Sequence, residues 1–210
     1  MSSADPHLSP SLELAPSRVS AAGVSEAALI QGIVNKQEWA AAALWARFGS
    51  VVHRIADRAL GSPHEAEDLT QDVFICLFKK LASLREPLAL RGFVLAVTIR
   101  NLKWRLRRRR MRQWIHLTES GELPELPVRG IDMDQALRRF YRLLDQLRVD
   151  DRMVFVLRRV DGMQLRDVAQ ATGHSLATVK RHLRRADAEL SRFMEGEPVL
   201  VSFLRHEGSA

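Results

Sequence analysis

The apolar residues of this chain recur at intervals of three and four positions, which is the spacing of helices that bury one face. Three stretches of the first half carry such stripes, at Ala41, Leu44, Phe48, Val51, Ile55 and Ala59; at Ala66, Leu69, Val73, Leu77 and Leu81; and at Leu95, Ile99, Leu102 and Leu106. No alternating strand pattern of comparable strength occurs. The sequence therefore predicts an all-α fold.

Local signals set the ends of the first helices. A helical pattern begins at Glu26 and should end at Gly61, a residue that readily ends a helix. Ser62 can cap the next helix, Pro63 suits its first position, and Glu65 stands where a capping box requires it. We therefore expect a new helix to start directly after Gly61.

A second helical region follows a segment that breaks helices. Between Thr118 and Arg129 the chain holds three glutamates together with Gly121, Pro124 and Pro127. Beyond it, apolar stripes recur at Met133, Leu137, Phe140, Leu144 and Leu147, and at Met153, Val156, Leu157 and Val160. The expected divisions are a flexible leader at 1–25, a helical domain at 26–115, a short acidic linker at 116–131, a second helical domain at 132–194 and a tail at 195–210.

Composition narrows the class of protein. The chain has 210 residues, of which 46% are apolar and 27% charged, as in ordinary globular proteins. No uncharged stretch approaches the roughly 20 residues of a membrane helix, so we expect no membrane insertion. The leader lacks the pattern of a secretory signal, and the single cysteine, Cys76, cannot form an intramolecular disulfide. We expect a cytoplasmic protein.

Basic charge is concentrated in one short segment. Residues 100–112 carry eight basic residues and no acidic ones, whereas the whole chain has a net charge of +7. Such a block is typical of a surface that binds phosphate, although a solvated basic run is the simpler alternative. Arginine outnumbers lysine 27 to 5, which suits bidentate contacts to phosphate or guanine but also follows from GC-rich coding.

The segment LRDVAQATGHSLATVKRH, at 165–182, has the spacing of a helix-turn-helix. Small Ala169 allows two helices to approach, Gly173 suits the tight turn, and Ser175 can cap the second helix. Basic residues follow on that helix, where they could enter a major groove. The alternative is a purely structural helical hairpin.

Three segments together resemble the extracytoplasmic-function sigma factors of bacterial RNA polymerase. HEAEDLTQDVFICLFKKL resembles the polymerase-binding helix of that family, and RGFVLAVTIRNLKWRLRRRR resembles the helix that recognises and opens the minus-ten element. DRMVFVLRRVDGMQLRDVAQATGHSLATVKRHLRRADAEL resembles the domain that binds the minus-thirty-five element. The segments occur in the family's order across roughly residues 37–194, so 26–115 corresponds to sigma domain 2 and 132–194 to sigma domain 4.

The resemblance implies partners and sites for this chain. Its partners would be core RNA polymerase, through the beta-prime coiled coil and the beta flap, promoter DNA, and an anti-sigma factor such as restrains many relatives. The residues implied in core binding are Asp68, Gln71, Asp72, Ile75 and Phe78. Those implied at the minus-ten element are Arg100, Asn101, Lys103, Trp104, Arg107, Arg108 and Arg110. Those implied at the minus-thirty-five element are Ser175, Thr178, Lys180, Arg181, Arg184 and Arg185.

Some of these residues have simpler, purely structural explanations. Trp104 shares a helical face with Val97 and Asn101 and could belong to the core. Acidic residues at the start of the 63–80 helix could merely complement the helix dipole. Of the minus-thirty-five candidates, we expect Arg181 and Arg184 to approach base edges, while neighbouring cations hold phosphates.

The resemblance implies transcription initiation without catalysis by this chain. Its histidines are scattered, and no Gly-rich phosphate loop or nucleophile motif occurs, so we expect neither an enzyme nor a cofactor. The protein would associate with the nucleoid when it is bound to polymerase. The main alternative is a free-standing helix-turn-helix regulator that binds operators as a dimer. A helical adaptor that binds RNA or anionic membrane through its basic tract is a third possibility.

Overall fold

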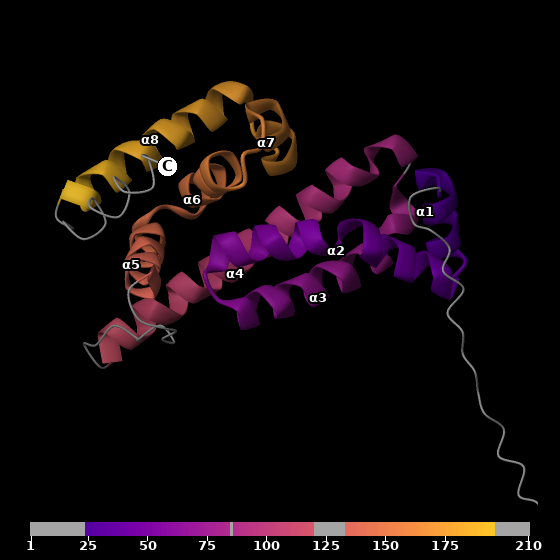
Figure 1. The fold of residues 1–210 in the computed structure, drawn as a ribbon, viewed down its shortest axis with the longest axis horizontal. Helices are drawn as coiled ribbons and strands as arrows, with labels where there is room; N and C mark the ends of the chain where they lie inside the picture. The colour runs from indigo at the N-terminus through magenta and orange to yellow at the C-terminus, as the bar shows by residue number, and fades with distance from the viewer. Residues whose placement is uncertain (1–23, 85, 120–132, 196–210) are drawn as a thin grey trace, which may run out of the picture.

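The computed structural model describes residues 24–84, 86–119 and 133–195, and within these ranges the chain forms helices and turns without strands. The expectation of an all-α fold is therefore confirmed (Figure 1). The elements are α1 (Glu26–Val34), α2 (Glu38–Leu60), α3 (Pro63–Lys80), η1 (Leu81–Ser83), η2 (Pro87–Ala89), α4 (Leu90–Glu119), α5 (Met133–Gln146), α6 (Val149–Phe155), η3 (Val156–Val160), α7 (Leu165–Thr172) and α8 (Leu176–Glu195).

Helices α1 to α4 form the first half of the molecule. The predicted stripe of α3 is buried throughout, and so are the four predicted apolar positions of α4. On α2, Ala41 and Val51 are only half-buried, whereas the other predicted positions are in the core. The periodicity thus identified the buried faces of these helices.

The single helix expected from Glu26 to Gly61 is wrong, because the chain turns between α1 and α2. Lys36 adopts a positive φ of 56°, which interrupts the helical backbone. The turn brings the Trp39 ring onto Gly32, where a Cβ would lie 2.7 Å from the indole. Apolar spacing could not reveal this break, because α1 and α2 both bury apolar residues.

The expected boundary after α2 is present. Gly61 ends α2 with φ of 69°, and Ser62 Oγ accepts a hydrogen bond of 3.4 Å from the amide of Glu65. The Tyr141 ring from the second half packs against Gly61, where a Cβ would meet it at 2.5 Å. Gly61 is therefore required both by its backbone conformation and by this close approach.

Helices α5 to α8 form the second half. Gly173 turns the chain between α7 and α8 with φ of 71°, and Ser175 Oγ caps α8 by accepting from the Thr178 amide at 3.2 Å. This is the predicted helix-turn-helix. Leu137, placed on an apolar stripe, is instead 47% exposed, whereas Leu143 and Leu144, further along α5, are buried.

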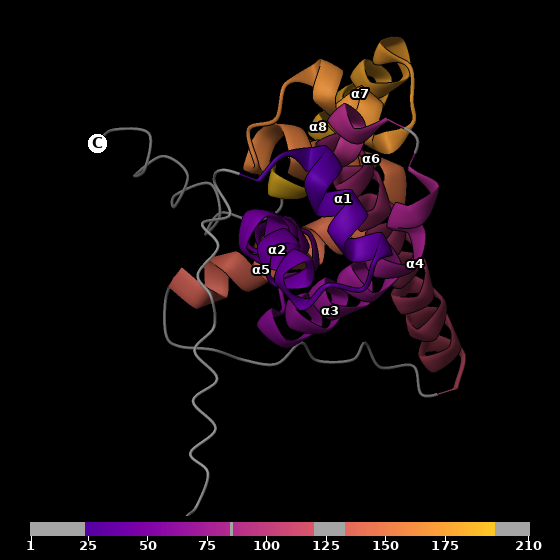
Figure 2. The same ribbon diagram turned by 90° about the vertical axis from the view of Figure 1, so that its right-hand side faces the viewer.

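The two halves lie against each other. Helix α4 contacts both α6 and α7, and α2 contacts η3 (Figure 2). Helix α4 also continues as far as Glu119, into the segment expected to form the linker. Nearly all of the predicted leader, the rest of the linker and nearly all of the predicted tail lie outside the described residues.

Within the described part of the chain, none of the helices combines the length and apolar character that crossing a bilayer requires.

The core of the first half gives a direct test of the fold. Leu102 is fully buried on α4, so Leu102→Ala should lower the free energy of unfolding by about 2–5 kcal/mol through lost burial and the cavity left behind. Leu88 is 90% exposed, and Leu88→Ala should change that free energy by less than about 0.5 kcal/mol. Urea unfolding followed by circular dichroism measures both. Equal effects would contradict this placement of α4.

Candidate nucleic-acid interface

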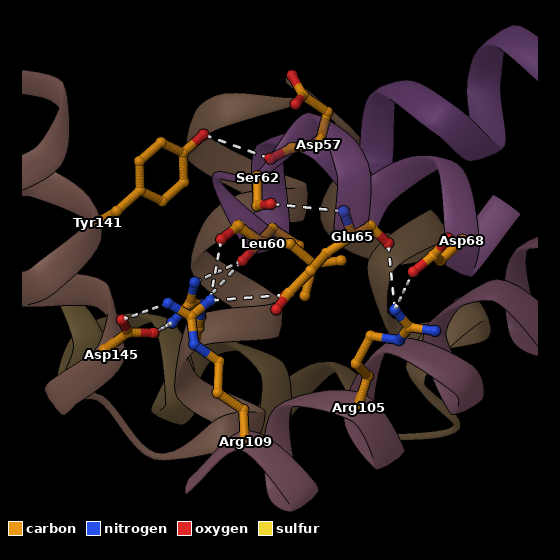
Figure 3. A network of polar contacts seen from close by, with 11 residues as sticks. Asp57, Leu60, Ser62, Glu65, Asp68, Arg105, Arg109, Tyr141 and Asp145 are labelled. Atoms are coloured by element: carbon orange, nitrogen blue, oxygen red, sulfur yellow. Dashed lines mark hydrogen bonds and ion pairs between the residues drawn. The ribbon is translucent and has the colours of Figure 1, made fainter. Parts of the chain in front are cut away.

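Arg105 of α4 folds back onto α3 instead of facing solvent. Its guanidinium lies 3.7 Å from Asp68 Oδ2 (Figure 3). It also lies 2.8 Å from Asp72 Oδ2, and the Arg105 side chain is 18% exposed. A second nitrogen contact, of 3.5 Å, reaches the carbonyl of Glu65. Arg105 therefore joins α4 to the acidic first half of α3.

Arg109, one turn further along α4, has a similar structural role. It donates to the carbonyl of Leu60 at the end of α2 and to Asp145 Oδ2 of α5, both at 3.2 Å. Its side chain is 11% exposed, and Glu65 lies within 3.8 Å of it. These two arginines were outside the predicted DNA-contacting set, and the structure uses both to connect helices.

The other arginines of the basic segment face outward. Those that are exposed are Arg100, Arg107, Arg108, Arg110 and Arg112. Trp104 lies among them at 56% exposure, with the Arg108 guanidinium 5.3 Å from its ring centroid. The alternative that Trp104 belongs to the core is therefore excluded. An aromatic ring beside cations suits an unpaired nucleic-acid strand, because bases stack on the ring while the cations hold phosphates.

Lys103 and Asn101, also predicted at the minus-ten element, have protein partners. Lys103 Nζ lies 2.7 Å from Asp150 Oδ1 of α6, and its side chain is 14% exposed. Burial raises the pKa of Asp150, but the hydrogen bond and charge of Lys103, with His174, outweigh this and hold that pKa below its usual value. Asn101 Nδ2 donates to the carbonyl of Val97 at 2.9 Å.

The helix-turn-helix presents a second basic face on α8. Lys180, Arg181 and Arg184 are exposed, on the helix that Ser175 caps. Arg185 differs, because it donates at 2.8 Å to Asp151 Oδ1, a carboxylate with no exposed surface. The structure thus separates three cations that face solvent from one that fixes α8 to α6.

The five residues predicted to bind core polymerase share the outward side of α3. Gln71, Asp72, Ile75 and Phe78 are exposed, and Asp68 is partly so. Ile75 at 52% and Phe78 at 39% leave apolar surface in solvent. Because Asp68 and Asp72 are also the partners of Arg105, they serve the packing of α4 as well as any binding of a partner.

Sequence reasoning missed Trp45 on α2. Its side chain is 49% exposed, and its ring centroid lies 4.4 Å from that of Phe74, so it extends the apolar surface of α3. A large aromatic residue directly after the buried Leu44 was the available signal, because that position cannot share the face of Leu44.

No group of three or more histidine, cysteine or acidic side chains within the described ranges is arranged to hold a metal ion.

Family comparisons match both halves of the chain. The family described as Sigma-70 region 2 matches residues 44–112, and that described as Sigma-70, region 4 matches residues 137–190. The first match includes the outward faces of α3 and α4, and the second includes the helix-turn-helix.

Two curated relatives have the same kind of sequence. The chain is 26% identical over 149 residues to the ECF RNA polymerase sigma factor SigE of Mycolicibacterium smegmatis, a match that covers 68% of this chain and 57% of the relative. It is 26% identical over 135 residues to the ferric citrate uptake sigma factor FecI of Escherichia coli, covering 61% of this chain and 76% of FecI. The chain thus spans little more than half of the SigE relative.

Solved structures share the fold. CnrH in complex with the cytosolic domain of CnrY aligns with a TM-score of 0.56 and 21% identity, over 80% of this chain and 96% of that one. The sigma factor RpoE of Bartonella quintana, in complex with the anti-sigma factor NepR, aligns with a TM-score of 0.52 and 18% identity, over 73% and 95%. With Sigma-70 regions 2 and 4 present in order over more than half of its length, the chain belongs to the sigma-70 family.

Proposed function

We propose that this chain is a promoter-specificity subunit of bacterial RNA polymerase, which binds the core enzyme and directs promoter recognition, DNA opening and transcription initiation. The observation that carries the proposal is the division of the basic segment of α4. Arg105 and Arg109 face the protein, whereas the five other arginines of the segment and Trp104 face solvent.

The outward face of α4 is the proposed minus-ten surface. Arg100, Arg107, Arg108 and Arg110 neutralise backbone phosphates, and Trp104 stacks on an unpaired base as the duplex opens. Lys103 and Asn101 join this surface once their protein contacts are exchanged for DNA. Strand opening is then favoured because the protein binds the separated strand more tightly than the duplex.

The exposed side of α8 is the proposed minus-thirty-five surface. We assign base-edge contacts to Arg181 and Arg184 and a phosphate contact to Lys180, with Ser175 and Thr178 at the start of the helix. Arg185 acts as a positioning residue, because its bond to Asp151 orients α8. A second, separate basic face on one chain favours a sigma factor over a dimeric operator-binding regulator.

The outward side of α3, extended by Trp45, is the proposed surface for the beta-prime coiled coil. Its acidic residues suit a basic partner, and Ile75, Phe78 and Trp45 supply the apolar contact that binding requires. The beta flap is the proposed partner of the second half. The chain adds specificity to chemistry performed by other subunits, so we assign it no catalytic residue and no cofactor.

Regulation and location follow from the same proposal. CnrH and RpoE were each solved in complex with another protein, the latter with an anti-sigma factor, and this supports an anti-sigma partner for the chain. We place the protein in the cytoplasm, and at the nucleoid when it is bound to polymerase.

Core binding is tested best at Ile75 and not at Asp72, because a change of Asp72 would also disturb Arg105. Ile75→Arg removes exposed apolar surface and adds a cation that repels a basic partner, so affinity for core polymerase should fall by at least about tenfold. Gln31→Arg, at an exposed position of α1, adds the same charge elsewhere and should leave affinity unchanged. Titration by fluorescence anisotropy measures both, and equal affinities for both variants would refute this assignment.

The α4 surface is tested by the salt dependence of promoter binding. Replacing Arg107 and Arg108 with alanine in the assembled holoenzyme should weaken binding and reduce the slope of log affinity against log salt by about two, since two phosphate contacts are lost. Lys79→Ala with Lys80→Ala removes the same charge from the end of α3 and should preserve the slope. An unchanged slope in the arginine variant would contradict phosphate binding by this face.

A further inference from the structure

Two acidic side chains of α3 already have a cation of the same chain beside them. Asp68 and Asp72 belong to the proposed polymerase-binding surface, and one oxygen of each contacts the guanidinium of Arg105. The distances from that guanidinium are 2.8 Å to Asp72 Oδ2 and 3.7 Å to Asp68 Oδ2. The chain therefore supplies its own positive charge at the place where a basic partner would bind.

The three side chains of this contact differ in exposure. Those of Asp68 and Asp72 keep 48% and 53% of their surface in solvent, whereas that of Arg105 keeps 18%. Figure 3 shows the Arg105 guanidinium next to Asp68 and to the backbone oxygen of Glu65, which lies 3.5 Å away. A partner can thus approach the two carboxylates from solvent, while Arg105 contacts them from α4.

Apolar packing holds α3 against α4 without these ion pairs. Both helices contribute buried side chains to one apolar cluster, namely Leu69, Val73, Leu102 and Leu106. Ion pairs between partly exposed side chains add little to the free energy of folding, because water competes for both charges. Replacing Arg105 by a cation of the partner at Asp72 should therefore cost the fold little.

Arg109, one turn further along α4, has contacts of a different kind. Its side chain is 11% exposed, and it donates at 3.2 Å both to the carbonyl of Leu60 and to Asp145. Neither acceptor belongs to the proposed polymerase-binding surface. Arg105 differs because two of its acceptors do belong to that surface, so its position bears on the binding of a partner.

We propose that Arg105 is an internal counter-ion of the polymerase-binding surface, which competes with basic groups of the polymerase for Asp68 and Asp72 and so lowers the affinity of the chain for the core enzyme. The inference rests on the proposed function, because it needs a basic partner on α3. Such a partner gains less from carboxylates that another cation already neutralises. Binding then depends more on the exposed apolar residues Ile75 and Phe78 than the acidic sequence of α3 suggests.

The affinity for core polymerase tests this competition, because a competing arginine and a merely structural one predict opposite changes. Arg105→Gln removes the charge, so the full-length chain should bind core polymerase about threefold to tenfold more tightly at low salt. Loss of a structural contact should weaken binding instead. The gain should shrink as salt approaches about 1 M, where ions screen these charges. Fluorescence anisotropy measures the affinity at each salt concentration.

Three further variants make the result specific. Arg105→Lys keeps the charge and should leave the affinity close to that of the unaltered chain. Lys36→Gln removes one positive charge from the exposed turn between α1 and α2 and should leave the affinity unchanged. In a chain that already carries Asp68→Asn and Asp72→Asn, Arg105→Gln should give no gain, because the carboxylates for which it competes are gone. Circular dichroism melting checks that each variant is folded.

The outcomes separate this inference from the proposed function. If the unaltered chain binds polymerase and Arg105→Gln binds equally or more weakly, the competition is refuted and the proposed function stands. A gain that persists without the two carboxylates, or that Lys36→Gln reproduces, would also overturn the competition. Absence of binding by both the unaltered chain and Arg105→Gln would refute the proposed function, and this inference with it.

Discussion

The packing of one face of α4 determines what the rest of the chain can do. Val94, Ile99, Leu102 and Leu106 are buried, which fixes the rotation of a helix that carries eight basic residues within 13 positions. This rotation places Arg105 and Arg109 at the edge of the buried face, where they contact carbonyls and carboxylates. The cations on the opposite side of α4 stay exposed to water. Burial of apolar surface thus selects which charges remain free for a ligand.

Local features of the fold were predictable, because their causes lie within a few residues of each other. The stripes of α3 and α4, the stop at Gly61 and the turn at Gly173 follow from helical periodicity and from backbone preferences that neighbouring residues cannot alter. The turn at Lys36 and the π-helical turn Val156–Val160 were not predictable in this way. Neither carries a glycine or proline within it, and tertiary packing outweighs local preference there.

The sequence predicted where the residues of the candidate site lie along the chain, but not which other side chains they contact. Spacing placed Trp104 and the arginines of α4 on one helix, and the family resemblance gave them a role, yet no pattern shows that Arg105 meets Asp72 or that Lys103 meets Asp150. These pairs join residues more than 30 positions apart, so they depend on how whole helices pack. The resemblance predicts which surface binds DNA, and only the structure distinguishes the exposed cations of that surface from those that hold the fold together.

The contact between the halves combines an apolar cluster that both halves share with ion pairs and hydrogen bonds. A buried charge such as that of Arg152, which reaches the Ala59 carbonyl of the other half, stabilises a protein no better than a well-packed apolar residue of the same size would. Apolar residues at this place, however, would be exposed whenever the halves separated, and an open state would then be costly or prone to aggregation. Charged groups lose less when they move from a partner to water. Arg54, Arg58, Asp161 and Arg152 therefore join the halves through groups that water can also satisfy.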